Sequence, residues 1–391
     1  MNSEVPDMNA FSRRAFVKAS LLLLGGSRGS GTLAAEAVFA AGRRGRAVIN
    51  SCGGFELPGD LTHGAAGPSD APILDPGRIR DALASDMIAV NQTLGHVFGD
   101  DEPFEQTVRE IGVWDELIRR SPQLIKVHGA QDIERAGREQ RLGIIFGFQN
   151  AAMLGDRLER VDLFADLGVR MLQLTYNDEN RLGRGALVPG TSGLTSFGRE
   201  VVGKLNARRV IVDLSHSSEQ VCLDAARAST RPPAISHTGC RALAEHPRNV
   251  SDEAMRLVAS RGGYVGIFFM PYLSPGRNPS AHDLVEHVEH AIKVCGEDHV
   301  GIGTDGGTSP IDVKAFQIEN AKDYARRTAA GIAAPGESPD LLPFIPELSG
   351  PNQFRTLSTL LAARGHGSSR IDKILSGNFL RFARDVWGTP G

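Results

Sequence analysis

The chain has 391 residues, of which 41% are hydrophobic and 23% are charged, and its formal net charge is −3. This composition is ordinary for a globular α/β protein and excludes the disordered and fibrous classes. The sequence contains no basic patch with interleaved aromatic residues, so we expect no nucleic-acid partner.

The N-terminal segment resembles a twin-arginine export signal. Its features follow one another in the expected order: Ser12-Arg13-Arg14-Ala15-Phe16-Val17-Lys18, an apolar stretch with leucines at 21–24, and a candidate cleavage site at 38–41. The apolar stretch is too short to span a bilayer. We therefore predict a signal over residues 1–41 that engages the twin-arginine export machinery and directs the protein to the periplasm or beyond. If the signal is retained, it would tether the protein to the membrane.

Past this segment, strand-like runs alternate with helical patterns. Eight short apolar runs are typical of buried parallel strands, at 46–50, 87–93, 143–149, 169–175, 209–214, 233–236, 264–269 and 300–304. Helical patterns occupy 105–120, 157–167, 198–206, 218–228, 252–260, 281–294, 352–364 and 369–387. This alternation predicts an α/β protein with a TIM-type (β/α)8 barrel, forming a single domain over residues 42–391.

Two long irregular stretches interrupt this pattern, at about 53–77 and about 306–350, and the second contains a helical piece at 313–327. They follow the first and the eighth strand, so both would emerge on the rim of the barrel that carries the chemistry. Long loops at that rim act as lids or specificity walls. A solvated insertion without function is the alternative.

Polar side chains follow three of the predicted strands. His216, His237 and Asp305 each close a short apolar run. Catalytic residues of a barrel lie at the carboxyl ends of its strands. Two imidazoles and a carboxylate meeting there indicate a metal-dependent hydrolase.

The remaining histidines and cysteines carry less information. His282, His287 and His290 fall in one helical run and are interpreted as residues of the outer helix layer. The four cysteines are too few and too dispersed to predict a disulfide scaffold. Their pairing is left open.

The order of motifs resembles the membrane (renal) dipeptidase family. The similarity runs from about residue 47 to 387 and rests on the segments 193–202, 212–216, 235–238, 246–249, 262–263, 300–305 and 377–381. It implies a metallopeptidase barrel that hydrolyses dipeptides at a two-zinc site. Under this resemblance His216 and His237 are metal ligands, Asp305 handles the substrate ammonium and protons, and Arg248 holds the substrate carboxylate. For Arg248, a structural role in its loop is the alternative.

The chain departs from the family pattern at four positions. Cys52 and Gly54 stand where the family has a His-x-Asp pair, Gln149 replaces a bridging glutamate, and Tyr176 replaces a histidine. A neutral amide does not offset the repulsion of two dications, and glycine has no ligand atom. We therefore expect one Zn²⁺ rather than two, held by His216 and His237 with Gln149 or water. A metal-free site is the alternative. Cys52 is a further thiolate candidate beside its alternative as a small buried thiol.

Three functions follow from this pattern. The first is an exported hydrolase of dipeptides or small amides. In it a metal-held water attacks the carbonyl, Asp305 transfers protons and Tyr176 donates a hydrogen bond to the oxyanion. For Tyr176, packing beneath a loop is the alternative. The second is a mononuclear amidohydrolase or lyase acting on a non-peptide substrate. The third is a binding protein that has lost catalysis. A homodimer is compatible with all three.

Overall fold

The computed structural model describes residues 45–54, 74–95, 102–329 and 338–388. The predicted export signal and most of the first predicted insertion lie outside these residues. Among the described helices, none is both long enough and apolar enough to cross a membrane. The division of the chain into a signal and one barrel domain stays a prediction.

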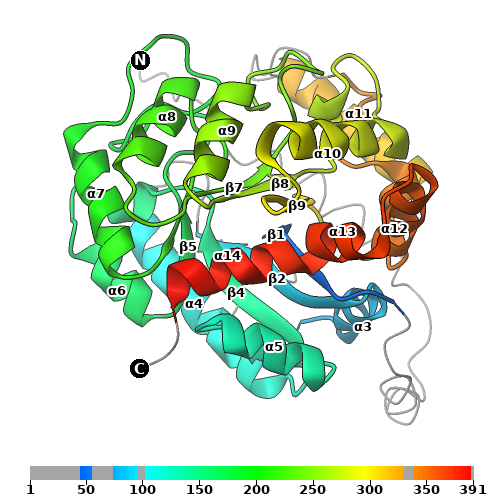
Figure 1. The fold of residues 1–391 in the computed structure, drawn as a ribbon, viewed down its shortest axis with the longest axis horizontal. Coiled ribbons are helices and arrows are strands. Elements are labelled where there is room, and N and C mark those ends of the chain that lie inside the picture. The colour runs from blue at the N-terminus through cyan, green and yellow to red at the C-terminus, as the bar shows by residue number, and fades with distance from the viewer. Residues whose placement is uncertain (1–44, 55–73, 96–101, 330–337, 389–391) are drawn as a thin grey trace.

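Eight parallel strands form the barrel in the order β1-β2-β4-β5-β6-β7-β8-β9, surrounded by helices (Figure 1). The strands are β1 (Val48–Gly53), β2 (Met87–Leu94), β4 (Leu142–Phe148), β5 (Val169–Gln173), β6 (Ile211–Asp213), β7 (Ala234–Thr238), β8 (Tyr264–Ile267) and β9 (Val300–Ile302). The predicted (β/α)8 barrel is confirmed, and each strand lies at a predicted run.

The first and last strands lie side by side and nearly close the barrel. The Asn50 side-chain amide donates to Thr304 Oγ1 at 2.9 Å, and the Thr304 N–H donates back to Asn50 Oδ1 at 2.9 Å. A parallel bridge joins Gly53 to Gly306 just beyond. These contacts bring the carboxyl ends of β1 and β9 together, so the residues that follow them share one edge of the barrel.

A ninth strand, β3 (Leu124–Lys126), pairs with the first half of β4 and was not predicted. Both β3 and β5 pair with the same side of β4. Strand β3 pairs with the first residues of β4, and β5 pairs with Phe146 to Phe148. Strand β3 contains only two apolar residues before Lys126, whereas the equally short β6 and β9 lie in longer apolar runs.

The helices pack around the strands (Figure 1). They are α3 (Pro76–Ala84), α4 (Pro103–Arg120), α5 (Ala130–Arg138), α6 (Arg160–Asp166), α7 (Ser196–Ala207), α8 (Glu219–Ala228), α9 (Asp252–Ser260), α10 (Ala281–Cys295), α11 (Val313–Ala329), α12 (Gln353–Ala363), α13 (Ser368–Asp372) and α14 (Asn378–Trp387). The predicted tail helix at 369–387 is instead α13 and α14 joined by a π-helical turn at Lys373–Gly377. Helices α3 and α5 were not predicted.

Helix α14 packs against residues of the barrel interior and crosses the strands in Figure 1. Its Phe379 and Phe382 rings lie 5.3 and 5.8 Å from the ring of Tyr264, the first residue of β8. Tyr264 OH donates to the Ile302 carbonyl at 3.2 Å. Because Tyr264 begins its strand, this apolar cluster fills the amino-terminal end of the barrel and leaves the carboxyl-terminal end for polar groups.

Candidate metal and substrate site

A chain of hydrogen bonds orients His237 at the end of β7. The Asp213 carboxylate accepts from the Ser236 N–H at 2.9 Å, from Ser215 Oγ at 3.0 Å and from the Ser236 hydroxyl. Because the single Ser236 proton goes to the carboxylate, Ser236 Oγ accepts from His237 Nδ1–H at 2.8 Å. His237 Nε2 therefore carries the lone pair, and it is buried with no hydrogen-bond partner among the described residues.

His216 follows β6 and shows the same arrangement. Its Nδ1 donates to Asn177 Oδ1 at 2.8 Å, and its Nε2 is likewise buried with no partner in the described part of the chain. The two imidazole rings lie 4.9 Å apart. Fixing Nδ1–H by an acceptor leaves the Nε2 lone pair available to a metal, the arrangement that metal-binding histidines generally show.

Two residues of this edge adopt left-handed backbone conformations. The φ angles are +61° at His216 and +58° at Asp305. Such conformations cost about 1–3 kcal/mol in residues other than glycine and concentrate at functional sites. Here they turn the chain directly after β6 and β9.

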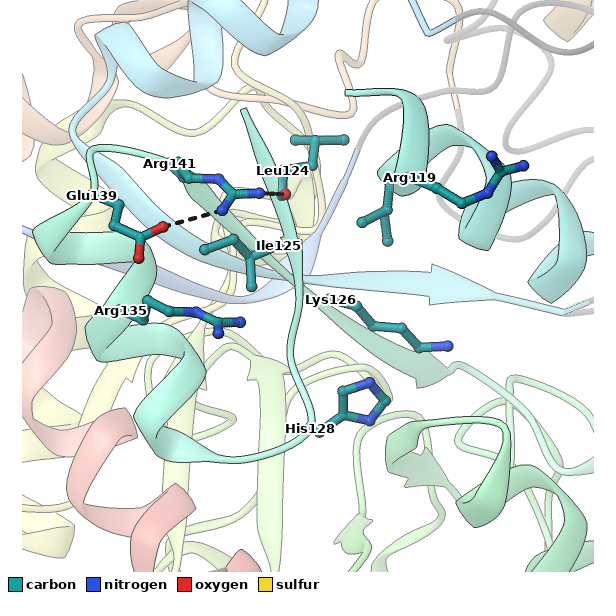
Figure 2. A pocket seen from close by; sticks show the side chains of 9 residues that line it. Arg119, Leu124, Ile125, Lys126, His128, Arg135, Glu139 and Arg141 are labelled. Atoms are coloured by element: carbon teal, nitrogen blue, oxygen red, sulfur yellow. Dashed lines mark hydrogen bonds and ion pairs between the residues drawn. The ribbon is translucent and has the colours of Figure 1, made fainter. Parts of the chain in front are cut away.

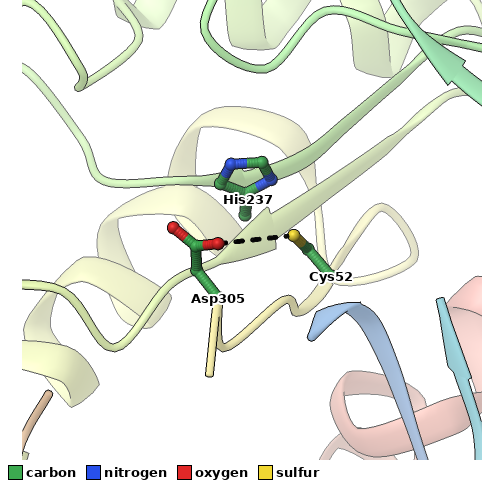
Figure 3. Close-up of side chains that lie close together, drawn as sticks. All are labelled: Cys52, His237 and Asp305. Carbon is green, nitrogen blue, oxygen red and sulfur yellow. Dashed lines mark hydrogen bonds between the residues drawn. The ribbon is translucent and has the colours of Figure 1, made fainter. Parts of the chain in front are cut away.

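Cys52, Gln149 and Asp305 meet beside His237. The Asp305 N–H donates to the Cys52 carbonyl at 2.9 Å, which fixes β1 against the turn after β9. The Cys52 thiol lies 3.7 Å from Asp305 Oδ1, and Gln149 Nε2 donates to both, at 3.2 Å to Oδ1 and 3.4 Å to Sγ. Figure 3 shows Cys52, His237 and Asp305 pointing toward one another.

The donor set of this cluster fits a divalent cation. One ligand atom each from Cys52, His237 and Asp305 lies within 4.8 Å of the other two. His216 adjoins the group through His237 without belonging to it. Two buried nitrogen lone pairs without partners, a thiol and a carboxylate are the ligands that zinc binds in proteins.

Burial keeps both histidines in the neutral form that binds metals. It lowers the pKa of His216 well below the ordinary value, and the Arg248 guanidinium and His237 lower it further. Burial also lowers the pKa of His237, where Asp305 acts in the opposite direction. Neither imidazole therefore needs to lose a proton before a cation binds.

Arg248 is buried in the loop after β7, with 3% of its surface exposed. Its Nη2 has no hydrogen-bond partner among the described residues. The loop is held by Asn249, whose side-chain amide donates to the carbonyls of Ala244 and Tyr272 at 2.8 Å. A buried guanidinium with an open donor is suited to bind a carboxylate in the planar, bidentate manner of arginine.

The structure places the predicted site residues at one edge of the barrel, with some differences in detail. Tyr176 stacks on His216 with ring centroids 4.1 Å apart, so its ring covers one face of that imidazole. Gln149 donates to Cys52 and to Asp305. These assignments of roles remain predictions.

Sequence reasoning missed three residues that orient the histidines. Asp213 and Ser236 form the relay to His237, and Asn177 holds His216. A carboxylate inside the apolar run that ends at His216 was the available signal, because a buried charge requires partners.

The space around Gly54 is filled by another side chain. A Cβ built on Gly54 would collide with the side-chain amide of Gln92, and its φ of +155° is one that other residues rarely adopt. Gln92 is buried on β2, the strand next to β1. An aspartate at position 54 would therefore require both side-chain and backbone rearrangement.

A separate pocket of about 460 Å³ lies away from this edge and is lined mainly by basic residues (Figure 2). Its cations face acids: Lys126 Nζ lies 2.6 Å from Asp115 Oδ1, and Arg141 Nη1 lies 3.1 Å from Glu139 Oε2. Arg141 precedes β4 and Gln149 follows it, so a strand length of roughly 25 Å separates the pocket from the histidine edge.

Comparison with known proteins identifies the family of the chain. The model of the membrane dipeptidase family, peptidase family M19, matches residues 59–330. The crystal structure of an amidohydrolase from Pseudomonas aeruginosa is 28% identical with a TM-score of 0.73, covering 91% of this chain and 99% of that one. An uncharacterized protein in the pqqA 5' region of Klebsiella pneumoniae is 28% identical over 300 residues, which are 73% of this chain and 98% of that protein.

The dipeptidase tcpJ of Claviceps purpurea is 28% identical over 271 residues, which are 68% of this chain. The match spans 56% of that dipeptidase, little more than half of its length.

Proposed function

Since the chain belongs to the membrane dipeptidase family, peptidase family M19, we propose that it hydrolyses the amide bond of dipeptides or similarly small amides at the edge formed by His216, His237 and Asp305. The observation that carries this proposal is the pair of buried Nε2 atoms that have no hydrogen-bond partner in the described part of the chain, with the Asp305 carboxylate beside His237. Two such atoms would each leave a hydrogen-bonding capacity unused in a site without a ligand.

His216 and His237 would hold one divalent cation together with Asp305, and Zn²⁺ suits these ligands. When bound, the cation supplies a Lewis acid and a water of lowered pKa. The Asp305 carboxylate is placed to take a proton from the attacking water and return it to the leaving amine. The neutral Gln149 amide keeps that carboxylate in place by donating to Oδ1.

Arg248 would bind the carboxylate of the substrate and align the scissile carbonyl with the histidines. Its buried position increases the strength of that contact, because the surrounding dielectric is low. Tyr176 would donate its hydroxyl to the oxygen on which negative charge develops. These groups converge on a small molecule with an amide next to a terminal carboxylate.

The direct test is dipeptide turnover by purified protein of known metal content. We expect hydrolysis that is lost on treatment with a chelator and restored by Zn²⁺. Absence of cleavage across a panel of dipeptides at full metal loading would contradict the proposal.

A second candidate is a small non-peptide amide. Gly54 and Gln149 stand where the family has carboxylate ligands of a two-metal site. In addition, the chain is 28% identical to the amidohydrolase from Pseudomonas aeruginosa. Faster turnover of an amide that lacks a free α-amino group than of any dipeptide would favour this candidate.

We further propose that the twin-arginine segment exports the protein. The supporting observation is the arginine pair followed by Phe16, Lys18 and an apolar stretch. Lysine at both Arg13 and Arg14 is expected to leave the full-length precursor in the cytoplasm of a bacterial host, as cell fractionation would show. Equal export of the variant would contradict a twin-arginine route.

A further inference from the structure

We infer that the Cys52 thiolate is itself a further ligand of the metal that His216, His237 and Asp305 would hold, and that Gln149 serves this thiolate as a hydrogen-bond donor rather than ligating the metal. This inference rests on the proposed metal site, and it goes beyond the proposed hydrolysis by defining a cysteine-containing, mononuclear centre.

The positions of the side chains support ligation by sulfur. Cys52 Sγ, an imidazole nitrogen of His237 and an Asp305 oxygen lie within 4.8 Å of one another, and all three side chains face one point (Figure 3). Cys52 is 1% exposed and forms no disulfide. The backbone bond from the Asp305 N–H to the Cys52 carbonyl holds the two side chains side by side.

The charges of the cluster also suit a cation. The Cys52 thiol donates to the Asp305 carboxylate at 3.7 Å in a partly buried place. The carboxylate disfavours the thiolate form that a nucleophilic cysteine needs, because two neighbouring negative charges repel each other where water is scarce. A divalent cation between them is balanced by one thiolate and one carboxylate.

The Gln149 amide completes this arrangement. Its Nε2 donates to both Cys52 Sγ and Asp305 Oδ1, so its protons face the two anionic ligands. An N–H group that donates to a ligand's sulfur lies outside the coordination shell and tunes the ligand. Among the described residues, no other group of three potential metal ligands lies close together. Gln92 fills the space beside Gly54.

X-ray absorption at the zinc edge of the full-length wild-type protein tests this inference without any substitution. One sulfur at about 2.3 Å, with nitrogen and oxygen at about 2.0–2.1 Å, is the expected shell. A shell of nitrogen and oxygen only would overturn the inference.

Cobalt replacement gives a second readout. The Co²⁺ form should show near-ultraviolet sulfur-to-cobalt absorption, which C52S abolishes and C222S leaves intact. Cys222 is a matched control because it is equally buried, yet its thiol faces the carbonyls of Leu214 and Ser217. Unchanged absorption in C52S would assign the sulfur elsewhere and overturn the inference.

The two proposals fail in different ways. A sulfur-containing shell in a protein that cleaves no dipeptide or small amide would retain Cys52 as a ligand and reject the hydrolase. Turnover by a protein whose metal has no sulfur neighbour would retain the hydrolase and reject Cys52. Failure to bind any metal would reject the inference outright.

Discussion

The orientation of a single imidazole depends on a hydroxyl in this protein. Ser236 links Asp213 to His237 through two hydrogen bonds: its hydroxyl donates to the carboxylate and accepts from the imidazole Nδ1–H. Without that hydroxyl, the buried Nδ1–H loses its acceptor and the histidine is free to present the wrong nitrogen.

Ser236→Ala is therefore expected to weaken metal binding by about 10–100-fold, the usual effect of losing an outer hydrogen-bond partner of a ligand. Competition with a chelator measures the dissociation constant. Ser229→Ala is the control, because Ser229 is equally buried but donates to Asn206 and Arg231 outside the site. Equal metal affinity in S236A and wild type would refute the relay.

Arg248 gives a prediction about the substrate. Arg248→Lys should lower kcat/KM for a dipeptide by about 10–100-fold, because a lost charge-assisted hydrogen bond is worth about 1.5–3 kcal/mol. For the same dipeptide with an amidated C-terminus, kcat/KM should be nearly the same in Arg248→Lys and wild type, since this substrate offers no carboxylate. Arg256→Lys, at a site where the arginine contacts Asp252 on the surface of α9, is the control. A similar loss for both substrates would mean that Arg248 supports the loop instead.

At the scale of elements, α10 ties two rim loops to the barrel. His287 on α10 accepts from the Cys240 N–H at 2.9 Å through Nδ1 and donates to the Leu273 carbonyl at 3.0 Å through Nε2. These loops follow β7 and β8. The sequence interpretation of His287 as a structural residue of the helix layer agrees with these contacts, although the tether itself was not predicted.

His287→Leu should lower the free energy of unfolding at pH 7.5 by about 2–4 kcal/mol, because two buried backbone groups lose their partners. Burial lowers the pKa of His287 to about 4. Between about pH 6.5 and 4 the unfolded chain binds a proton that the folded imidazole does not, so the stabilisation by His287 declines as the pH falls through this range. Denaturant unfolding at several pH values should show the cost of the substitution shrinking toward pH 4. A cost independent of pH would contradict this assignment.

The strands and helices also show which features could be predicted from the sequence. Runs such as 143–149 gave the barrel strands because buried parallel strands are continuously apolar. Strand β3 has no such run, because Leu124 and Ile125 are followed by a lysine. Helix α5 was missed although Ala130, Ile133 and Ala136 give it a buried face. Cys52, Gln149 and Asp305 could be placed at strand ends from the sequence, but their mutual distances depend on how β1, β4 and β9 are staggered around the barrel. The relay from Asp213 through Ser236 depends on β6 and β7 being neighbours.

At the scale of the whole molecule, the aromatic cluster of α14 and the candidate site lie at opposite ends of the barrel. The rings of α14 pack at the amino-terminal end, and the histidines and Asp305 follow the strands at the other. Loss of packing at one end should therefore leave the other intact.

Phe382→Ala tests this separation. Phe382 is fully buried against Tyr264 and Phe379, so its truncation should cost about 3–5 kcal/mol of unfolding free energy. The metal dissociation constant of the folded protein should stay within a few-fold of wild type. A parallel loss of metal affinity would show that α14 and the site are coupled.

The most direct test of the account is a metal titration of the apoprotein, with bound zinc and dipeptide hydrolysis measured on the same samples. We predict that activity rises in proportion to zinc and reaches its maximum at one ion per chain. Activity that appears only as a second ion binds, or no activity at any loading, would contradict a mononuclear hydrolase built on His216, His237 and Asp305.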